Sequence, residues 1–169
     1  MPSHGLVNKS MNEKAIILNS SIRRDIDAID QIYAALGRHA TTSRSLVKVD
    51  EDGLIVISYH LHHLYTAFEN IFQNIATLFE NSVDDKGRWH SQLLERMNLD
   101  ALPLRPQVID AIAYDALNEL RRFRYVFRHA YSIQLDPERL VLVLRKALIL
   151  KQVYRQQLEK FMAFLQAME

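Results

Sequence analysis

Apolar residues recur at steps of three and four along most of this 169-residue chain, and that spacing constrains its fold more than any other feature. Residues three or four apart share one face of an α-helix, whereas a half-buried β-strand shows strict alternation. Stripes of apolar residues with this spacing start at Ile22, Val108 and Leu140. Four Gly and four Pro are too few for a turn-rich β-sandwich or β-barrel, so the sequence predicts an all-α protein. The longest stripe consists of Ile57, Leu61, Leu64, Phe68, Ile71, Ile75 and Leu78.

Capping and turn residues predict where the helices begin and end. Gly37 stands where the C-terminal cap of the first long helix is expected. A short amphipathic helix is predicted over residues 89–97. Pro106 is expected in the first turn of the next helix, which should end near Ser132. Asp136, with the Pro and Glu that follow it, is a strong start signal for the last helix.

The connections between these helices are short, which favours antiparallel neighbours. We therefore expect an antiparallel up-and-down bundle of four long helices plus one short helix, forming a single domain over residues 1–169. The chain has no Cys, which excludes disulfides, thiolate zinc sites and thiol catalysis. We see neither an export signal nor an uncharged span of about 18 residues, so we expect a cytoplasmic protein without a membrane partner.

The most unusual stretch of the chain is basic. Arg121, Arg122, Arg124 and Arg128 lie within eight residues that contain no acidic side chain, and His129 follows directly. Because the formal net charge of the whole chain is +1, the remaining residues carry a net charge of −3. An Arg-rich helix end can simply be solvated, since the helix dipole favours cations there. Here interleaved aromatic residues and the adjacent His favour a phosphate-binding site.

Arg and His together suffice for RNA cleavage without a metal ion. A His transfers protons near neutral pH, and an Arg stabilises the charge that develops on a phosphate. Arg124 and His129 are five residues apart, which separates their directions by about 140° on an ideal helix. One straight helix would not aim both side chains at the same phosphate. Either the helix end is distorted, or the same helix of a second subunit completes the site across a two-fold axis.

The same residues resemble a known family. Arg124, His129 and Tyr131 match the Arg-x-x-x-x-His-x-Tyr motif of the HepT-like toxins in the HEPN superfamily. Two further segments, residues 59–69 and 88–97, are similar to the second and third helices of that family. The resemblance extends over nearly the whole chain.

This resemblance implies a homodimeric, metal-independent endoribonuclease that is the toxin of a toxin–antitoxin system and needs no cofactor. Arg124 and His129 would form its catalytic pair. The antitoxin partner would be a small nucleotidyltransferase that transfers AMP to Tyr131 and thereby silences the nuclease. The residues expected to contact the RNA substrate are the other Arg side chains of the cluster, Arg121, Arg122 and Arg128.

Two alternative functions stay open at this point. One is a helical scaffold without catalytic activity that only docks the nucleotidyltransferase. The other is a metal-binding bundle in which His60, His63 and Glu69 supply ligands. Glu69 could instead neutralise an Arg of the basic cluster. The chain departs from the superfamily pattern at Tyr125, where Asn, Asp or His is often found.

Overall fold

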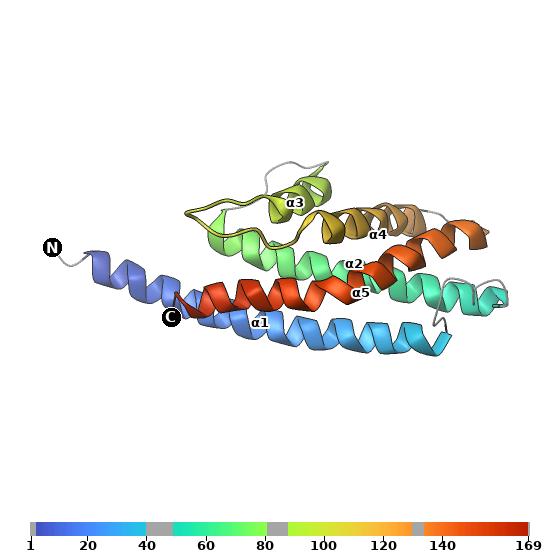
Figure 1. Ribbon diagram of the computed structural model, residues 1–169, viewed down its shortest axis with the longest axis horizontal. Coiled ribbons are helices and arrows are strands. Elements are labelled where there is room, and N and C mark those ends of the chain that lie inside the picture. Colours follow the sequence, from blue (N-terminus) through green and yellow to red (C-terminus); the bar gives the residue numbers. More distant parts are fainter. Residues whose placement is uncertain (1–2, 40–48, 81–87, 130–133, 169) are drawn as a thin grey trace.

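The computed structural model describes residues 3–39, 49–80, 88–129 and 134–168, and all regular structure in these ranges is helical. The predicted all-α fold is therefore confirmed: four long helices and one short helix occupy the described part of the chain (Figure 1). None of the helices in these ranges combines the length and apolar character that crossing a membrane requires. The helices are α1 (Ser3–His39), α2 (Glu51–Phe79), α3 (Trp89–Asn98), α4 (Ala111–His129) and α5 (Pro137–Gln166).

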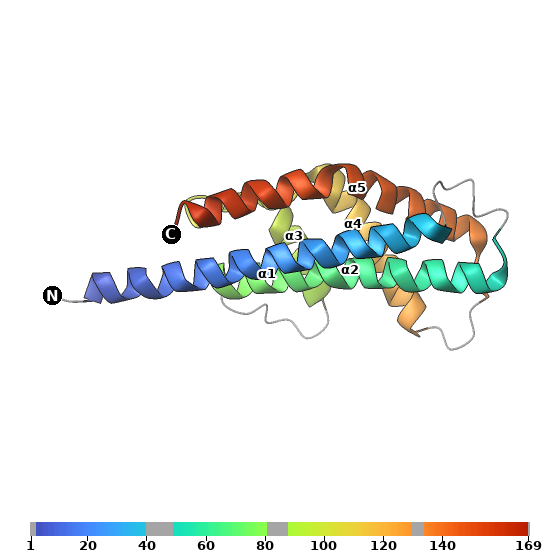
Figure 2. The ribbon, with the colours of Figure 1, turned by 90° about the horizontal axis from the view of Figure 1, so that it is seen from below.

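The long helices pack side by side as an up-and-down bundle. α1 packs along α2, and α4 packs along α5; further contacts join α2 to α4 and α1 to α5. The short helix α3 lies to one side of the bundle, against α2 and α4 (Figures 1 and 2). The N-terminal turns of α1 extend beyond the other helices, which makes α1 much longer than its apolar stripe predicted.

The predicted stripe of α2 lies at the centre of the core. Ile57, Leu61, Leu64, Phe68, Ile71 and Ile75 are all fully buried, and only Leu78 at the end of the stripe is half-buried. Burying one such side chain contributes about 1.5–3 kcal/mol, so this face of α2 is a main source of stability. The core joins α2 to apolar residues of the other four helices.

Local signals fix the starts of the helices. The Asp50 carboxylate accepts a hydrogen bond from the Gly53 amide at 2.9 Å and caps α2. A Cβ at Gly53 would lie 2.3 Å from Cγ1 of Val49, so a larger residue at this position would force the Val49 side chain to move. Asp136 caps α5 in the same way through the Glu138 amide at 3.0 Å, which confirms the predicted start of the last helix.

Two predicted boundaries are wrong. Gly37 does not cap α1, because the helix continues through it to His39 and no described glycine has a positive φ. Pro106 is not in the first turn of α4, which begins only at Ala111; the Asp110 carboxylate caps it by accepting from the Ala113 amide at 2.9 Å. The predicted end of this helix near Ser132 lies outside the described residues.

The loop between α3 and α4 is held by a buried arginine that sequence patterns did not indicate. Arg105 is only 1% exposed and donates from Nε to Oε1 of Glu80, at the end of α2, at 2.7 Å. Its terminal nitrogens donate to the backbone carbonyls of Arg96, Leu99 and Pro106 at 2.8–3.2 Å. This one side chain therefore fixes the end of α3 and the following loop against α2.

We predict that Arg105→Met lowers the free energy of unfolding by about 3–5 kcal/mol, because it leaves a largely buried carboxylate without its main partner. Urea denaturation measures the change. The matched control is Arg122→Met, which removes an exposed ion pair with Glu119 and should cost less than about 1 kcal/mol. An equal decrease in the free energy of unfolding of the two variants would contradict this role of Arg105.

Candidate active site

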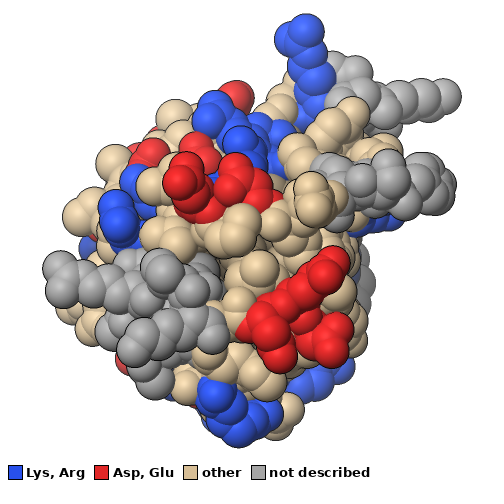
Figure 3. Space-filling model, turned by 90° about the vertical axis from the view of Figure 1, so that its right-hand side faces the viewer, with Lys and Arg blue, Asp and Glu red and all other residues tan. Residues whose placement is uncertain are grey.

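A cleft of about 690 Å³ lies between α3 and the C-terminal half of α4, with Tyr65 of α2 in its wall. Residues 88–91 form its α3 side. Among the described residues that line it are four Arg and two His, and none of these residues is acidic. Three Arg of the predicted basic cluster are thus gathered in one concave place, and Arg88 joins them from the start of α3. By contrast, the end face of the bundle carries side chains of both signs (Figure 3).

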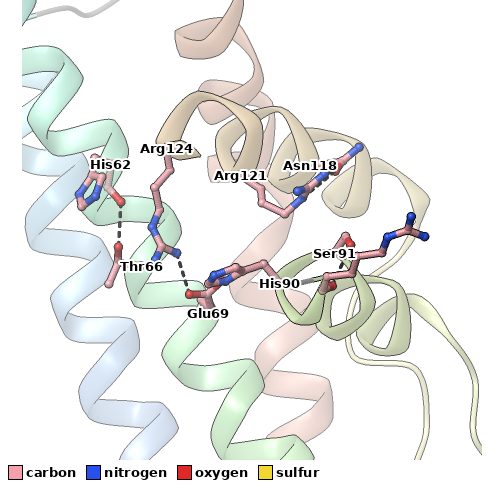
Figure 4. A network of polar contacts seen from close by, with 9 residues as sticks. His62, Thr66, Glu69, His90, Ser91, Asn118, Arg121 and Arg124 are labelled. Carbon is pink, nitrogen blue, oxygen red and sulfur yellow. Dashed lines mark hydrogen bonds and ion pairs between the residues drawn. The ribbon is translucent and has the colours of Figure 1, made fainter. Parts of the chain in front are cut away.

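A buried carboxylate joins the three helices around this cleft. Glu69 of α2 accepts from Nη1 of Arg124 at 2.7 Å through Oε1, and its Oε2 lies 2.6 Å from Nδ1 of His90 (Figure 4). The Glu69 side chain is only 5% exposed. Both of its oxygens are therefore engaged, one by α4 and the other by α3. This is the neutralising role that the sequence left as an alternative for Glu69.

Arg124 is held on two sides and lies mostly inside the protein. Its side chain is 11% exposed, and its guanidinium carbon lies 5.4 Å from the centre of the Tyr65 ring. Burial and the neighbouring Glu69 carboxylate raise the pKa of Tyr65, so its hydroxyl stays protonated. One guanidinium nitrogen is engaged by Glu69, and an Arg has five N–H donors, so donors remain for a phosphate at the cleft.

His129 lies at the exposed end of the described part of α4. Its Nδ1 is 2.7 Å from the backbone carbonyl oxygen of Tyr125. Because a carbonyl only accepts hydrogen bonds, Nδ1 carries the hydrogen, and Nε2 is the nitrogen that is able to take up or release a proton at the cleft. The Tyr125 ring lies against the imidazole, with 4.3 Å between ring centres. The unusual residue after Arg124 therefore supports His129 with both its backbone and its ring.

The remaining Arg side chains of the basic cluster divide into two groups. Arg121 and Arg128 line the cleft, and Arg121 is oriented by two hydrogen bonds to Oδ1 of Asn118, at 3.0 and 3.1 Å. Arg122 is not among the lining residues and pairs with Glu119 on the outside of α4 at 3.0 Å. Tyr131 lies outside the described residues.

The histidines of α2 do not assemble with Glu69 into a metal site. In the described ranges, no group of three or more His, Asp or Glu side chains is arranged to hold a metal ion. Both Glu69 oxygens face Arg124 and His90 instead. Burial, together with Arg124, His63 and Arg128, lowers the pKa of His62, so this ring is neutral at pH 7.

His90 is the cleft residue that the sequence did not single out. It carries no periodic signal, and its partner Glu69 is 21 residues away in the chain. Trp89, beside it, is half-buried, packs against the core and lines the same cleft. Only the tertiary packing of α3 against α2 brings this imidazole to Arg124.

Comparison with known protein families identifies a match. Residues 56–165 match a family model described as HepT-like protein, which is well over half of the chain. The matched segment contains Glu69, His90, Arg124 and His129. A search of curated proteins and a search of solved structures found no similar protein.

Proposed function

The chain belongs to the family of HepT-like proteins, and on this premise we propose that it is a metal-independent endoribonuclease, the toxin of a toxin–antitoxin pair that acts on cellular RNA in the cytoplasm. The observation that carries the proposal is the cleft itself. Its described lining gathers four Arg and two His and includes no acidic residue, which suits a polyanion whose phosphates need both binding and proton transfer.

In this proposal the RNA supplies its own nucleophile. The 2′-hydroxyl attacks the neighbouring phosphorus, and His129 takes part in proton transfer through Nε2. Arg124 donates hydrogen bonds to the phosphate and stabilises the charge that develops on it. Its ion pair with Glu69 fixes the guanidinium beforehand, so little reorganisation is needed when the substrate binds. Arg121 and Arg128 bind phosphates on either side of the reacting one.

We propose a homodimer as the active form. α4 is helical through His129, and Arg124 and His129 nevertheless line the same cleft of one chain. A second copy of the same helix end across a two-fold axis would bring its own Arg and His to the cleft. Dimerisation would also double the local positive charge that attracts RNA.

The proposed regulation uses the motif tyrosine. A small nucleotidyltransferase antitoxin would transfer AMP to the Tyr131 hydroxyl, two residues after His129. Each adenylate adds negative charge and bulk beside a cleft that is built to receive a phosphate. It would therefore repel the RNA substrate.

We predict that His129→Ala lowers RNA cleavage by at least about 10²-fold, because it removes the proton-transfer group. The assay incubates purified protein with total RNA and a metal chelator. The helical circular-dichroism spectrum should not change, since His129 is exposed.

Arg122→Ala is the matched control, because it lies on the same helix outside the cleft lining. If His129→Ala cleaves RNA and arrests growth like the wild type, the assignment of His129 is wrong. If the wild-type protein cleaves no RNA at all, the scaffold alternative is favoured.

We further predict that co-expression with a nucleotidyltransferase encoded beside this protein adds the mass of one or more adenylates, measured on the intact chain. The Tyr131→Phe variant lacks the acceptor hydroxyl and should gain no mass. Tyr125→Phe, which removes a nearby hydroxyl of the same kind, should be modified like the wild type. If the Tyr131→Phe variant gains the same mass as the wild type, Tyr131 is not the acceptor.

A further inference from the structure

A second imidazole, His90, opens onto the cleft from the first turn of α3. Its Nδ1 lies 2.6 Å from Oε2 of Glu69, while 35% of its side chain remains exposed (Figure 4). An ionised carboxylate only accepts hydrogen bonds, so Nδ1 carries a hydrogen. The other nitrogen, Nε2, is therefore the one that can exchange a proton with a substrate in the cleft that His90 shares with His129.

The position of the His90 ring is fixed by its surroundings. Glu69 is 5% exposed and is itself held by Arg124, so the carboxylate cannot swing away. The ring of Trp89 lies against the imidazole, with 3.6 Å between ring centres. A buried carboxylate that orients an imidazole and selects its tautomer is the arrangement that enzymes use for proton-transfer histidines.

The two imidazoles differ in their partners, and this difference separates their roles. The protonated form of His90 faces a carboxylate with a full negative charge, whereas that of His129 faces a backbone carbonyl with a partial one. In its imidazolium form His90 donates a charge-assisted hydrogen bond to that carboxylate, so the geometry suits His90 to the proton-donating role and His129 to the accepting one. Among the described residues, the other charged or titratable groups around His90 are Tyr65 and Glu69 on α2, Arg88 just before α3, and Arg121, Arg124, Tyr125 and Arg128 on α4.

From this geometry we propose that His90 is a second catalytic residue, the general acid of the ribonuclease reaction; the inference rests on the proposed function. The 2′-oxygen bonds to phosphorus as its proton passes to Nε2 of His129. The bond between phosphorus and the 5′-oxygen breaks as that oxygen receives the proton from Nε2 of His90. The products are a 2′,3′-cyclic phosphate and a 5′-hydroxyl, and exchange with water restores both imidazoles.

The test uses His90→Asn, in which the amide N–H takes the place of Nδ1–H. The variant can still donate to Glu69, but it has no second nitrogen that carries a proton. Two RNAs of the same sequence are compared after the cleavage position of the wild type has been mapped. One is ordinary RNA, and the other has sulfur in place of the 5′-oxygen at that position. A thiolate leaves without being protonated, so the second substrate does not need a general acid.

We predict that His90→Asn cleaves ordinary RNA at least about 10²-fold more slowly than the wild type and cleaves the sulfur-containing RNA at nearly the wild-type rate. His129→Ala should be slow on both RNAs. His63→Asn, which changes a histidine of α2 outside the cleft lining, should match the wild type on both.

Two results would overturn the role of His90. In one, His90→Asn cleaves ordinary RNA as fast as the wild type. In the other, it retains the helical spectrum and is equally slow on both RNAs, which would make His90 a structural residue. A wild-type protein that cleaves neither RNA would refute the proposed nuclease function itself, and the inference with it.

Discussion

The geometry of the cleft depends on one buried carboxylate. Glu69 on the central helix α2 binds Arg124 of α4 and His90 of α3, so a single side chain sets the positions of two groups that line the cleft. Removing one partner from a buried ion pair leaves an uncompensated charge, which typically costs about 3–5 kcal/mol. A second contact, the hydrogen bond from Arg105 to Glu80, holds the far end of α3 against the same helix. The short helix is thus fixed at both ends, and its imidazole is held in place.

This arrangement reconciles a net charge of +1 with the proposed site for a polyanion. The described lining of the cleft has four Arg and no acidic residue, and Glu69, which balances Arg124, lies behind it and is buried. The end face of the bundle, by contrast, carries charged side chains of both signs (Figure 3). A protein of this kind should bind RNA weakly over most of its surface and firmly at one place, with an affinity that falls as salt concentration rises.

Much of the fold and part of the site could be predicted from the sequence, because both rest on local patterns. The apolar period of α2 and the cap at Asp136 are local signals, and so is the spacing of Arg124 and His129. The rest depends on contacts between distant residues. Glu69 and Arg124 are 55 positions apart, and Arg105 fixes a loop through a carboxylate 25 positions away. No periodicity reports such pairings, so the place of His90 appears only in three dimensions. The true start of α4 has a local signal, the Asp110 cap, but Pro106 is an equally good start signal four residues earlier.

If Glu69 holds the proposed catalytic groups in place, the substitution Glu69→Gln should lower the metal-independent rate of RNA cleavage, and this rate tests the role of Glu69. This change keeps the size of the side chain but removes the charge that balances Arg124 and orients His90. We predict a rate about 10²-fold below that of the wild type, with the helical spectrum retained, while Glu119→Gln on the exposed side of α4 keeps the wild-type rate. A folded Glu69→Gln protein that cleaves RNA as fast as the wild type would show that Glu69 does not position Arg124 and His90 for cleavage.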